Sequence, residues 1–176
     1  MRRSLLIIAC SLVVLLAACS GDKETKMKGK EGISPLTGEK TSNANARPVA
    51  IMVNNHTKAR PQTGLSKADI VFEILAEGNI TRFLAIYQSE EPDEVGPVRS
   101  AREYYFKLAE GYDALYVYHG AAKFVDKLIQ DDGIDYINGA QHDNDGKLFI
   151  RSSDREAPHN SYVQFGAIQD EAKREG

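Results

Sequence analysis

The chain has 176 residues, of which 42% are hydrophobic and 27% are charged, and its formal net charge is −3. These proportions are those of an ordinary globular protein, so they exclude a collagen-like, a wholly disordered or a disulfide-scaffold protein. The negative charge argues against direct nucleic-acid binding, because affinity for nucleic acids depends on neutralising phosphates.

The N-terminus carries the pattern of an export signal. Arg2 and Arg3 precede an apolar run over residues 5–18, which is too short to span a bilayer core of ~30 Å but suits a secretory signal. The run ends in Leu16-Ala17-Ala18-Cys19, which resembles the lipobox of bacterial lipoproteins. We therefore predict a signal peptide over residues 1–18, cleavage before Cys19, and transfer of a diacylglyceryl group to the Cys19 thiol. The alternative is an ordinary signal peptide with an incidental cysteine.

Lipidation of Cys19 would fix both the location and the thiol chemistry. Two acyl chains (palmitate or similar), at ~0.8 kcal/mol per buried CH₂, anchor a protein stably where one chain does not. The protein is therefore expected on the extracytoplasmic face of the cell membrane. Because Cys10 would leave with the signal, no thiol would remain for a disulfide, for catalysis or for a zinc site.

Residues 19–46 are predicted to form a flexible tether. The segment is rich in Lys, Glu, Gly, Thr, Ser and Asn, and Met27, Ile33 and Leu36 are too few to build a core. Its root-mean-square reach is about 30 Å, which would hold the following domain off the lipid headgroups. A local turn is expected over residues 34–38.

From residue 47 onward the pattern is that of a folded domain. Residues 47–53 are predicted to be a buried strand. The short apolar run 69–75 fits a strand or a helix equally well. Residues 80–88 alternate as a strand does, with Phe83, Ala85 and Tyr87 on one face and Arg82, Leu84 and Ile86 on the other. Residues 95–98 are expected to form a short partner strand.

The second half of this domain is predicted to alternate helices and strands. Ser100 and Glu103 fit a capping box, so a helix is expected over residues 100–110, ending in a left-handed Gly111. The remaining predicted elements are a strand at 114–119, a helix at 121–130, strands at 135–137 and 148–150, and a helix at 167–174. Residues 47–176 are therefore predicted to be a single compact domain of the α/β (or α+β) class, a mixed sheet with helices packed on it.

Two segments of this acidic domain contain no acidic residue. Residues 47–176 hold 15 Lys and Arg against 21 Asp and Glu, yet residues 54–62 and 96–102 have none of the latter. Arg99 and Arg102 flank the predicted helix start, where backbone amides and the helix dipole favour an anion and arginine adds bidentate donors. The alternative is that these arginines pair with carboxylates nearby, such as Glu94 or Glu103. The hypothesis is one polar anion-binding cleft lined by Asn54, His56, Arg60, Arg82, Arg99 and Arg102.

The histidines and serines do not form a complete catalytic constellation. No two histidines have the i, i+4 spacing of a helical zinc site, so neither a metal nor another cofactor is expected. His159 and Asn160 follow Pro158 and are a candidate loop site, with a structural role as the equal alternative. Ser100 is a weak nucleophile candidate because capping already explains it. Catalytic residues are therefore not assigned, and an enzyme is the less favoured class.

Several strings together resemble the YerB-type lipoproteins of Gram-positive bacteria, a family whose domain has no established activity. The resemblance implies a membrane-anchored module that binds a ligand or a protein partner, and it implies a second, C-terminal domain that this chain is expected to lack. The strings are the lipobox, Pro35-Leu36-Thr37-Gly38, residues 47–62 and 64–71, Ile80-Thr81-Arg82-Phe83-Leu84-Ala85, residues 95–103, and Ala157-Pro158-His159-Asn160-Ser161-Tyr162.

A second resemblance supplies the alternative function. The order of strand, acidic turn, strand and arginine, followed by residues 116–120 and an amphipathic helix, is similar to the LytR-CpsA-Psr cell-wall ligases. That resemblance implies binding of a phosphorylated or pyrophosphorylated glycan or polyprenyl lipid, with Mg²⁺, and makes Arg82, Arg99 and Arg102 the pyrophosphate clamp. Ser100 and Ala101 stand where those ligases carry acidic metal ligands.

Overall fold

A mixed five-stranded sheet forms the centre of the computed structural model, which describes residues 31–175. Its strands lie in the order β4 (Ile70–Glu77), β5 (Ile80–Tyr87), β3 (Val49–Asn54), β7 (Leu115–Tyr118) and β8 (Tyr136–Asn138). The pairs β4–β5 and β5–β3 are antiparallel, whereas β3–β7 and β7–β8 are parallel. The predicted class, a mixed sheet with helices packed on it, is confirmed.

Burial along the strands follows their positions in the sheet. All six residues of the central strand β3 are buried, because both faces of the sheet are covered there. The edge strand β4 alternates, with Val71 and Leu75 41% and 57% exposed, so the ambiguous run 69–75 is a strand. On β5 the predicted alternation is confirmed, since Leu84 and Tyr87 join cores on opposite faces of the sheet.

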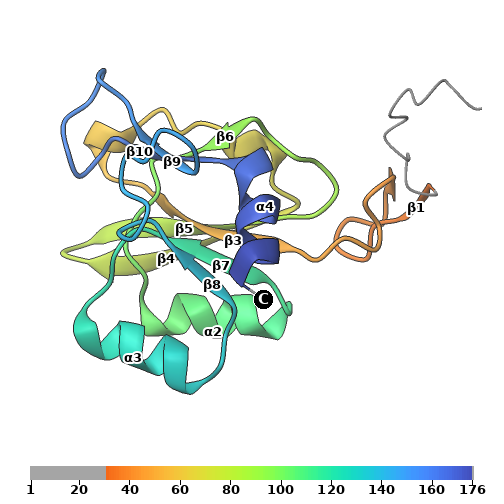
Figure 1. Ribbon diagram of the computed structural model, residues 1–176. Coiled ribbons are helices and arrows are strands. Elements are labelled where there is room, and N and C mark those ends of the chain that lie inside the picture. The colour runs from red at the N-terminus through yellow and green to blue at the C-terminus, as the bar shows by residue number, and fades with distance from the viewer. Residues whose placement is uncertain (1–30, 176) are drawn as a thin grey trace, which may run out of the picture. The chain divides into compact units, whose positions relative to one another are not determined.

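Two helices cover one face of the sheet (Figure 1). α2 (Glu103–Gly111) and α3 (Lys123–Asp131) bury apolar side chains against it. Phe106 and Ile129 are fully buried with Met52 of β3 in this core. The amphipathic pattern of residues 121–130 therefore predicted α3 to within a few residues.

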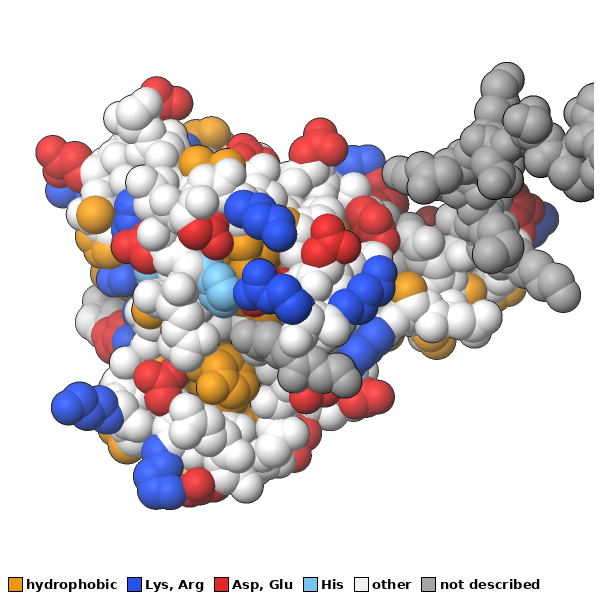
Figure 2. Space-filling model, viewed as in Figure 1, with side chains coloured by type: hydrophobic (Ala, Val, Ile, Leu, Met, Phe, Trp, Pro, Cys, Tyr) orange, Lys and Arg blue, Asp and Glu red, His pale blue; other side chains and the backbone are white. Residues whose placement is uncertain are grey.

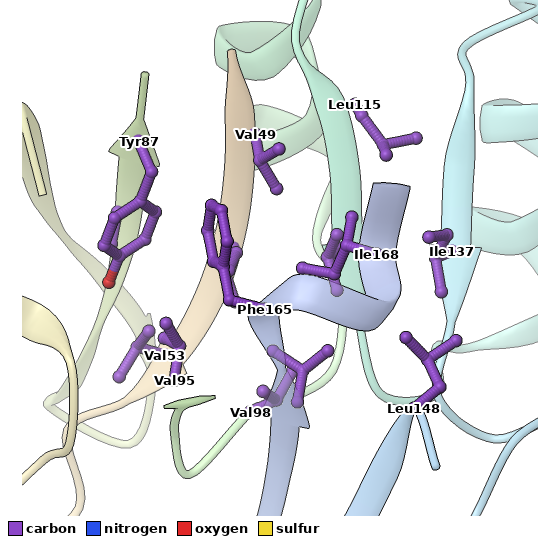
Figure 3. Close-up of a cluster of buried hydrophobic side chains, with 14 of the residues drawn as sticks. Val49, Val53, Tyr87, Val95, Val98, Leu115, Ile137, Leu148, Phe165 and Ile168 are labelled. Atoms are coloured by element: carbon purple, nitrogen blue, oxygen red, sulfur yellow. The ribbon is translucent and has the colours of Figure 1, made fainter. Parts of the chain in front are cut away.

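A second layer covers the other face. It consists of a small antiparallel sheet in the order β6 (Glu94–Val95), β10 (Ser161–Gln164) and β9 (Phe149–Arg151), followed by α4 (Phe165–Glu175). Phe165 and Ile168 point from α4 toward the central strands (Figure 3), and the Phe165 ring meets Tyr87 edge-on at 5.4 Å between centroids. Strand β10 was not predicted.

The predicted start of the first helix and the left-handed cap at its end are wrong, although the end itself lies within one residue of the prediction. α2 begins at Glu103, with Arg102 at the N-cap position and no side-chain cap, so the Ser100 capping box does not form. The preceding segment stays extended because its backbone bonds to neighbouring strands and loops; the Ala101 N–H donates to the Gly120 carbonyl at 3.0 Å. Gly111 is the last helical residue and lies outside the left-handed region.

Part of the predicted tether has defined structure. β1 (Gly32–Ile33) pairs with β2 (Lys40–Thr41) around a turn in which the Gly38 N–H donates to the Ser34 carbonyl at 2.9 Å. The Thr41 hydroxyl donates to the Ser89 carbonyl at 3.0 Å, which ties the hairpin to the end of β5. Residues 31–46 therefore have defined structure, whereas a flexible tether was predicted for them. The signal peptide, Cys19 and the rest of the tether lie outside the described residues.

Candidate functional site

The candidate site lies where β3 and β7 separate at their carboxyl ends. Their parallel pairing stops at Ile51, and the extended residues 97–99 enter the gap beyond it. The Arg99 N–H donates to the Met52 carbonyl at 2.9 Å, and the Arg99 carbonyl accepts from the His119 N–H at 3.0 Å. Sheets of this class hold ligands in the crevice outside the carboxyl ends of their parallel strands. The topology therefore places Arg99 at the edge of the sheet where such a crevice is expected.

The guanidinium of Arg99 is half-buried and lacks a countercharge within residues 31–175. No carboxylate of this part of the chain lies within 4.0 Å of it, and none of the side-chain hydrogen bonds found there involves it. Burial lowers the pKa of Arg99, and the nearby charge of Arg82 lowers it further. Both effects disfavour the protonated, positively charged form of Arg99.

His159 presents a second donor beside Arg99. The Asn54 Oδ1 accepts from the His56 N–H at 3.0 Å, so the Asn54 amide nitrogen faces His159 Nδ1, also at 3.0 Å. Since that amide nitrogen can only donate, neutral His159 must accept at Nδ1 and carry its proton on Nε2. Burial lowers the pKa of His159, with further contributions from His56, Arg99 and Lys58.

His119 also lies close to Arg99. Its Nδ1 lies 2.8 Å from the Ser161 hydroxyl, and its Nε2 lies 3.4 Å from Arg151 Nη2. Because arginine only donates, Nε2 accepts and Nδ1–H donates to Ser161. Burial lowers the pKa of His119, and the charges of Arg151 and Arg99 add to the effect. Arg151 is itself paired with Asp143, at 2.7 Å.

Three of the predicted arginines are engaged elsewhere. Glu77, at the end of β4, forms ion pairs with both Arg82 (Nη2–Oε2, 2.8 Å) and Arg102. This is the alternative pairing, but with a carboxylate that the sequence did not single out. Arg82 also donates to the Ser100 carbonyl at 2.6 Å, and Arg60 donates from Nε to the Asn55 side chain at 3.0 Å.

Of the predicted site residues, the structure therefore groups some and separates others. Asn54, His56, Arg99 and His159 lie together, and Arg82 lies close enough to affect Arg99. Arg60 bonds to Asn55 and Arg102 to Glu77. Asn160 is buried and accepts from Arg151 at 2.8 Å, so it braces the loop.

Sequence reasoning missed His119 and Arg151 as neighbours of the crevice. His119 is the last residue of a predicted strand, and recognising that this strand runs parallel to residues 47–53 would have placed it at the same sheet edge. Arg151 carried no such local signal, because its position depends on the pairing of β9 with β10.

The surroundings of the crevice constrain its chemistry. Within residues 31–175, no three His, Cys, Asp or Glu side chains gather as a metal site requires, and no helix there is long and apolar enough to cross a bilayer. Positive and negative side chains are interspersed on the face shown in Figure 2, so that face carries no extended basic surface. A single anionic group is a better match than a long polyanion.

Comparisons with known proteins agree with the resemblance drawn from the sequence. The chain is 48% identical over 169 residues to a Bacillus subtilis (strain 168) protein named "Putative lipoprotein YerB", covering 95% of this chain and 50% of that protein. The crystal structure of the YerB protein from Bacillus subtilis superposes with a TM-score of 0.77 at 52% identity, over 81% of this chain and 49% of that one. The chain thus spans about half the length of these relatives.

A family model matches residues 36–176 and describes them as the N-terminal domain of a protein of unknown function, DUF3048. The match covers all the strands and helices from β2 to α4, including those that form the crevice. The chain belongs to the DUF3048 family, the family of the YerB-type proteins.

Proposed function

We propose that this chain is the extracytoplasmic module of a lipid-anchored envelope protein and that it binds an anionic group of a ligand or partner in the crevice at Arg99. The observation that carries the proposal is the half-buried Arg99 guanidinium, which has no countercharge in the described part of the chain. Arg82, Arg102 and Arg151 around it each have a carboxylate partner.

The groups beside Arg99 favour an anion over a cation. The Nε2–H of His159 and the guanidinium N–H groups are donors. Burial and the charge of Arg82 both act against the Arg99 cation, and the opposite charge of an anion bound there would offset both effects. A charge-assisted hydrogen bond of this kind contributes about 1.5–3 kcal/mol.

The lipid anchor rests on different residues. The lipobox at Leu16–Cys19 supplies the acceptor thiol, and the 48% identical relative carries the word lipoprotein in its name. The acidic body, with a net charge of −3 for the whole chain, would gain little from an anionic membrane surface. Attachment would therefore depend on the acyl chains.

Calorimetric titration of the full chain in detergent with phosphate, pyrophosphate and succinate tests the anion site. Binding of at least one probe is expected, and Arg99→Ala should weaken it about tenfold or more. Arg47→Ala is the matched control, because Arg47 precedes the opposite end of β3 and pairs with Asp135. Equal heats for the parent and Arg99→Ala would overturn the proposal.

Expression in a Gram-positive host tests the anchor. The parent should enter the detergent phase and take up labelled palmitate, and Cys19→Ala should do neither. Cys10→Ala lies within the predicted signal and should behave as the parent does. Labelling that survives Cys19→Ala would contradict lipidation at this residue.

A further inference from the structure

A cavity lies beside the small sheet, and none of the residues described around Arg99 lines it. It has a volume of about 320 Å³. Glu94 belongs to β6, Ile150 to β9 and Tyr162 to β10, and loop residues complete the wall. A cavity of this size is at the lower end of those that hold small molecules. It is lined by Thr63, Glu94, Ile150, Ser152, Asp154, Arg155 and Tyr162.

Charges of both signs line this cavity without pairing with each other. Arg155 lies farther than 4.0 Å from the carboxylates of Glu94 and Asp154, since no ion pair joins them. In the described part of the chain, the Glu94 carboxylate accepts only from Gln164, at 3.3 Å. Elsewhere in the described part of the chain opposite charges do form ion pairs, as Arg151 and Asp143 do at 2.7 Å. The cavity keeps its charges apart.

The guanidinium of Arg155 is held in place by the backbone. It donates from Nη1 to the Ala59 carbonyl at 2.7 Å and from Nη2 to the Pro61 carbonyl at 2.8 Å. These bonds use two of its five N–H groups and leave its charge uncompensated by any carboxylate in residues 31–175. A fixed, unpaired guanidinium suits the recognition of a carboxylate, because little side-chain freedom remains to be lost.

The walls of the cavity are rigid and partly apolar. A Cβ on Gly96 would lie 2.6 Å from Cδ1 of Tyr162, so the tyrosine ring packs directly on the glycine backbone. Tyr162 is only 7% exposed, and burial raises the pKa of its hydroxyl, which therefore stays a neutral donor and acceptor. Ile150 is 37% exposed and offers an apolar contact.

We infer that this cavity binds a small zwitterion, a free α-amino acid or a dipeptide, with its carboxylate on Arg155 and its ammonium group on Glu94 and Asp154. Glu94 and Arg155 are half-buried, whereas Asp154 is exposed, so a ligand with only one charge would leave a half-buried charge without a partner. A ligand with both charges satisfies both sides at once. This site shares no residue with the crevice at Arg99.

Calorimetric titration of the full chain in detergent with the natural L-amino acids and L-alanyl-L-alanine tests the inference. At least one is expected to bind. Its N-acetylated form lacks the ammonium group and its amide form lacks the carboxylate, and each should bind about tenfold more weakly or not at all. These ligand changes probe both charges without altering the protein.

Protein variants complete the test. Glu94→Gln and Arg155→Gln should each weaken binding about tenfold or more. Arg99→Ala should leave it unchanged. If Arg155→Gln unfolds, Glu94→Gln and the modified ligands still decide the outcome. Failure of every zwitterion at millimolar concentration, or binding of the N-acetylated or the amide form as tight as that of the unmodified zwitterion, would overturn the inference.

Discussion

The imidazole rings of His56 and His159 are stacked, with their centroids 4.6 Å apart and their planes inclined at 26°. This contact joins the 3₁₀ turn η2 (Thr57–Ala59) to the loop before β10. Two protonated imidazoles would repel each other at this distance, and Arg99 adds a third positive charge nearby. These neighbouring charges favour the neutral form of His159, whose pKa is also lowered by burial.

The first prediction concerns pH. The pKa values of His119 and His159 lie below the ordinary 6.5 in the folded chain. As the pH falls through 6.5, the unfolded chain therefore takes up more protons than the folded chain does. The free energy of unfolding keeps its full value above that pH and decreases below it. Urea unfolding between pH values near 7 and 5 measures this. His119→Gln should flatten the dependence, and an unchanged slope in this variant would contradict the assignment.

The second prediction concerns the carboxylate shared by two arginines. Glu77→Gln leaves Arg82, whose side chain is only 6% exposed, without its countercharge. Because Glu77 itself is 56% exposed, solvent screens part of the loss, and we expect a destabilisation of about 1–2 kcal/mol in urea unfolding. Glu90→Gln is the control, since the Lys67–Glu90 pair is exposed on both sides and should cost less than about 1 kcal/mol.

The third prediction uses two adjacent tyrosines of α2. The buried Tyr105 hydroxyl lies 2.6 Å from the Ile74 carbonyl oxygen and 2.8 Å from that of Arg82. Tyr105→Phe should cost about 1–3 kcal/mol, because buried carbonyls lose their donor. Tyr104 is 41% exposed and donates to the Leu75 carbonyl, so Tyr104→Phe should cost clearly less. Equal thermal shifts for the two variants would refute this.

The fourth prediction compares alanine substitutions at two glycines, which should have opposite effects on stability. A Cβ on Gly139 would lie 2.6 Å from Phe149 Cε1 and 2.8 Å from His119 Nδ1, so Gly139→Ala should destabilise the chain by about 1–3 kcal/mol and disturb His119. Gly111 ends α2 with nothing within 4 Å of such an atom, and Gly111→Ala should stabilise by up to ~1 kcal/mol. Chemical denaturation of both variants checks the opposite signs.

Much of the fold was predictable because its signals are local. The apolar run of β3 and the alternation of β5 are patterns of neighbouring residues, and they predicted both strands to within two residues at each end. The start of α2 failed for a non-local reason: the segment before Glu103 bonds to β3 and to the Gly120 loop, which outweighs the capping box. β10 was missed because Ser161–Gln164 has no run of apolar residues.

For the candidate site, too, the sequence pointed to some residues and missed others. The acid-free segments brought Asn54, His56 and Arg99 to attention, and the structure places all three beside His159. The countercharge of Arg82 and Arg102 could not be found locally, because Glu77 lies on β4 and reaches them only through the pairing of β4 with β5. Sequence proximity suggested Glu94 and Glu103 instead.

The insertion of residues 97–99 between β3 and β7 has a consequence for how the site moves. The Arg99 amide is bonded to Met52 at the centre of the sheet, and the Val98 amide donates to the Ser161 carbonyl at 2.7 Å. These amides should exchange with deuterium only when the whole domain opens, at the rate of the β3 core. The proposed anion site then belongs to the same cooperative unit as the core. Its side chains can be substituted without affecting the fold, whereas a change in its backbone would destabilise the domain.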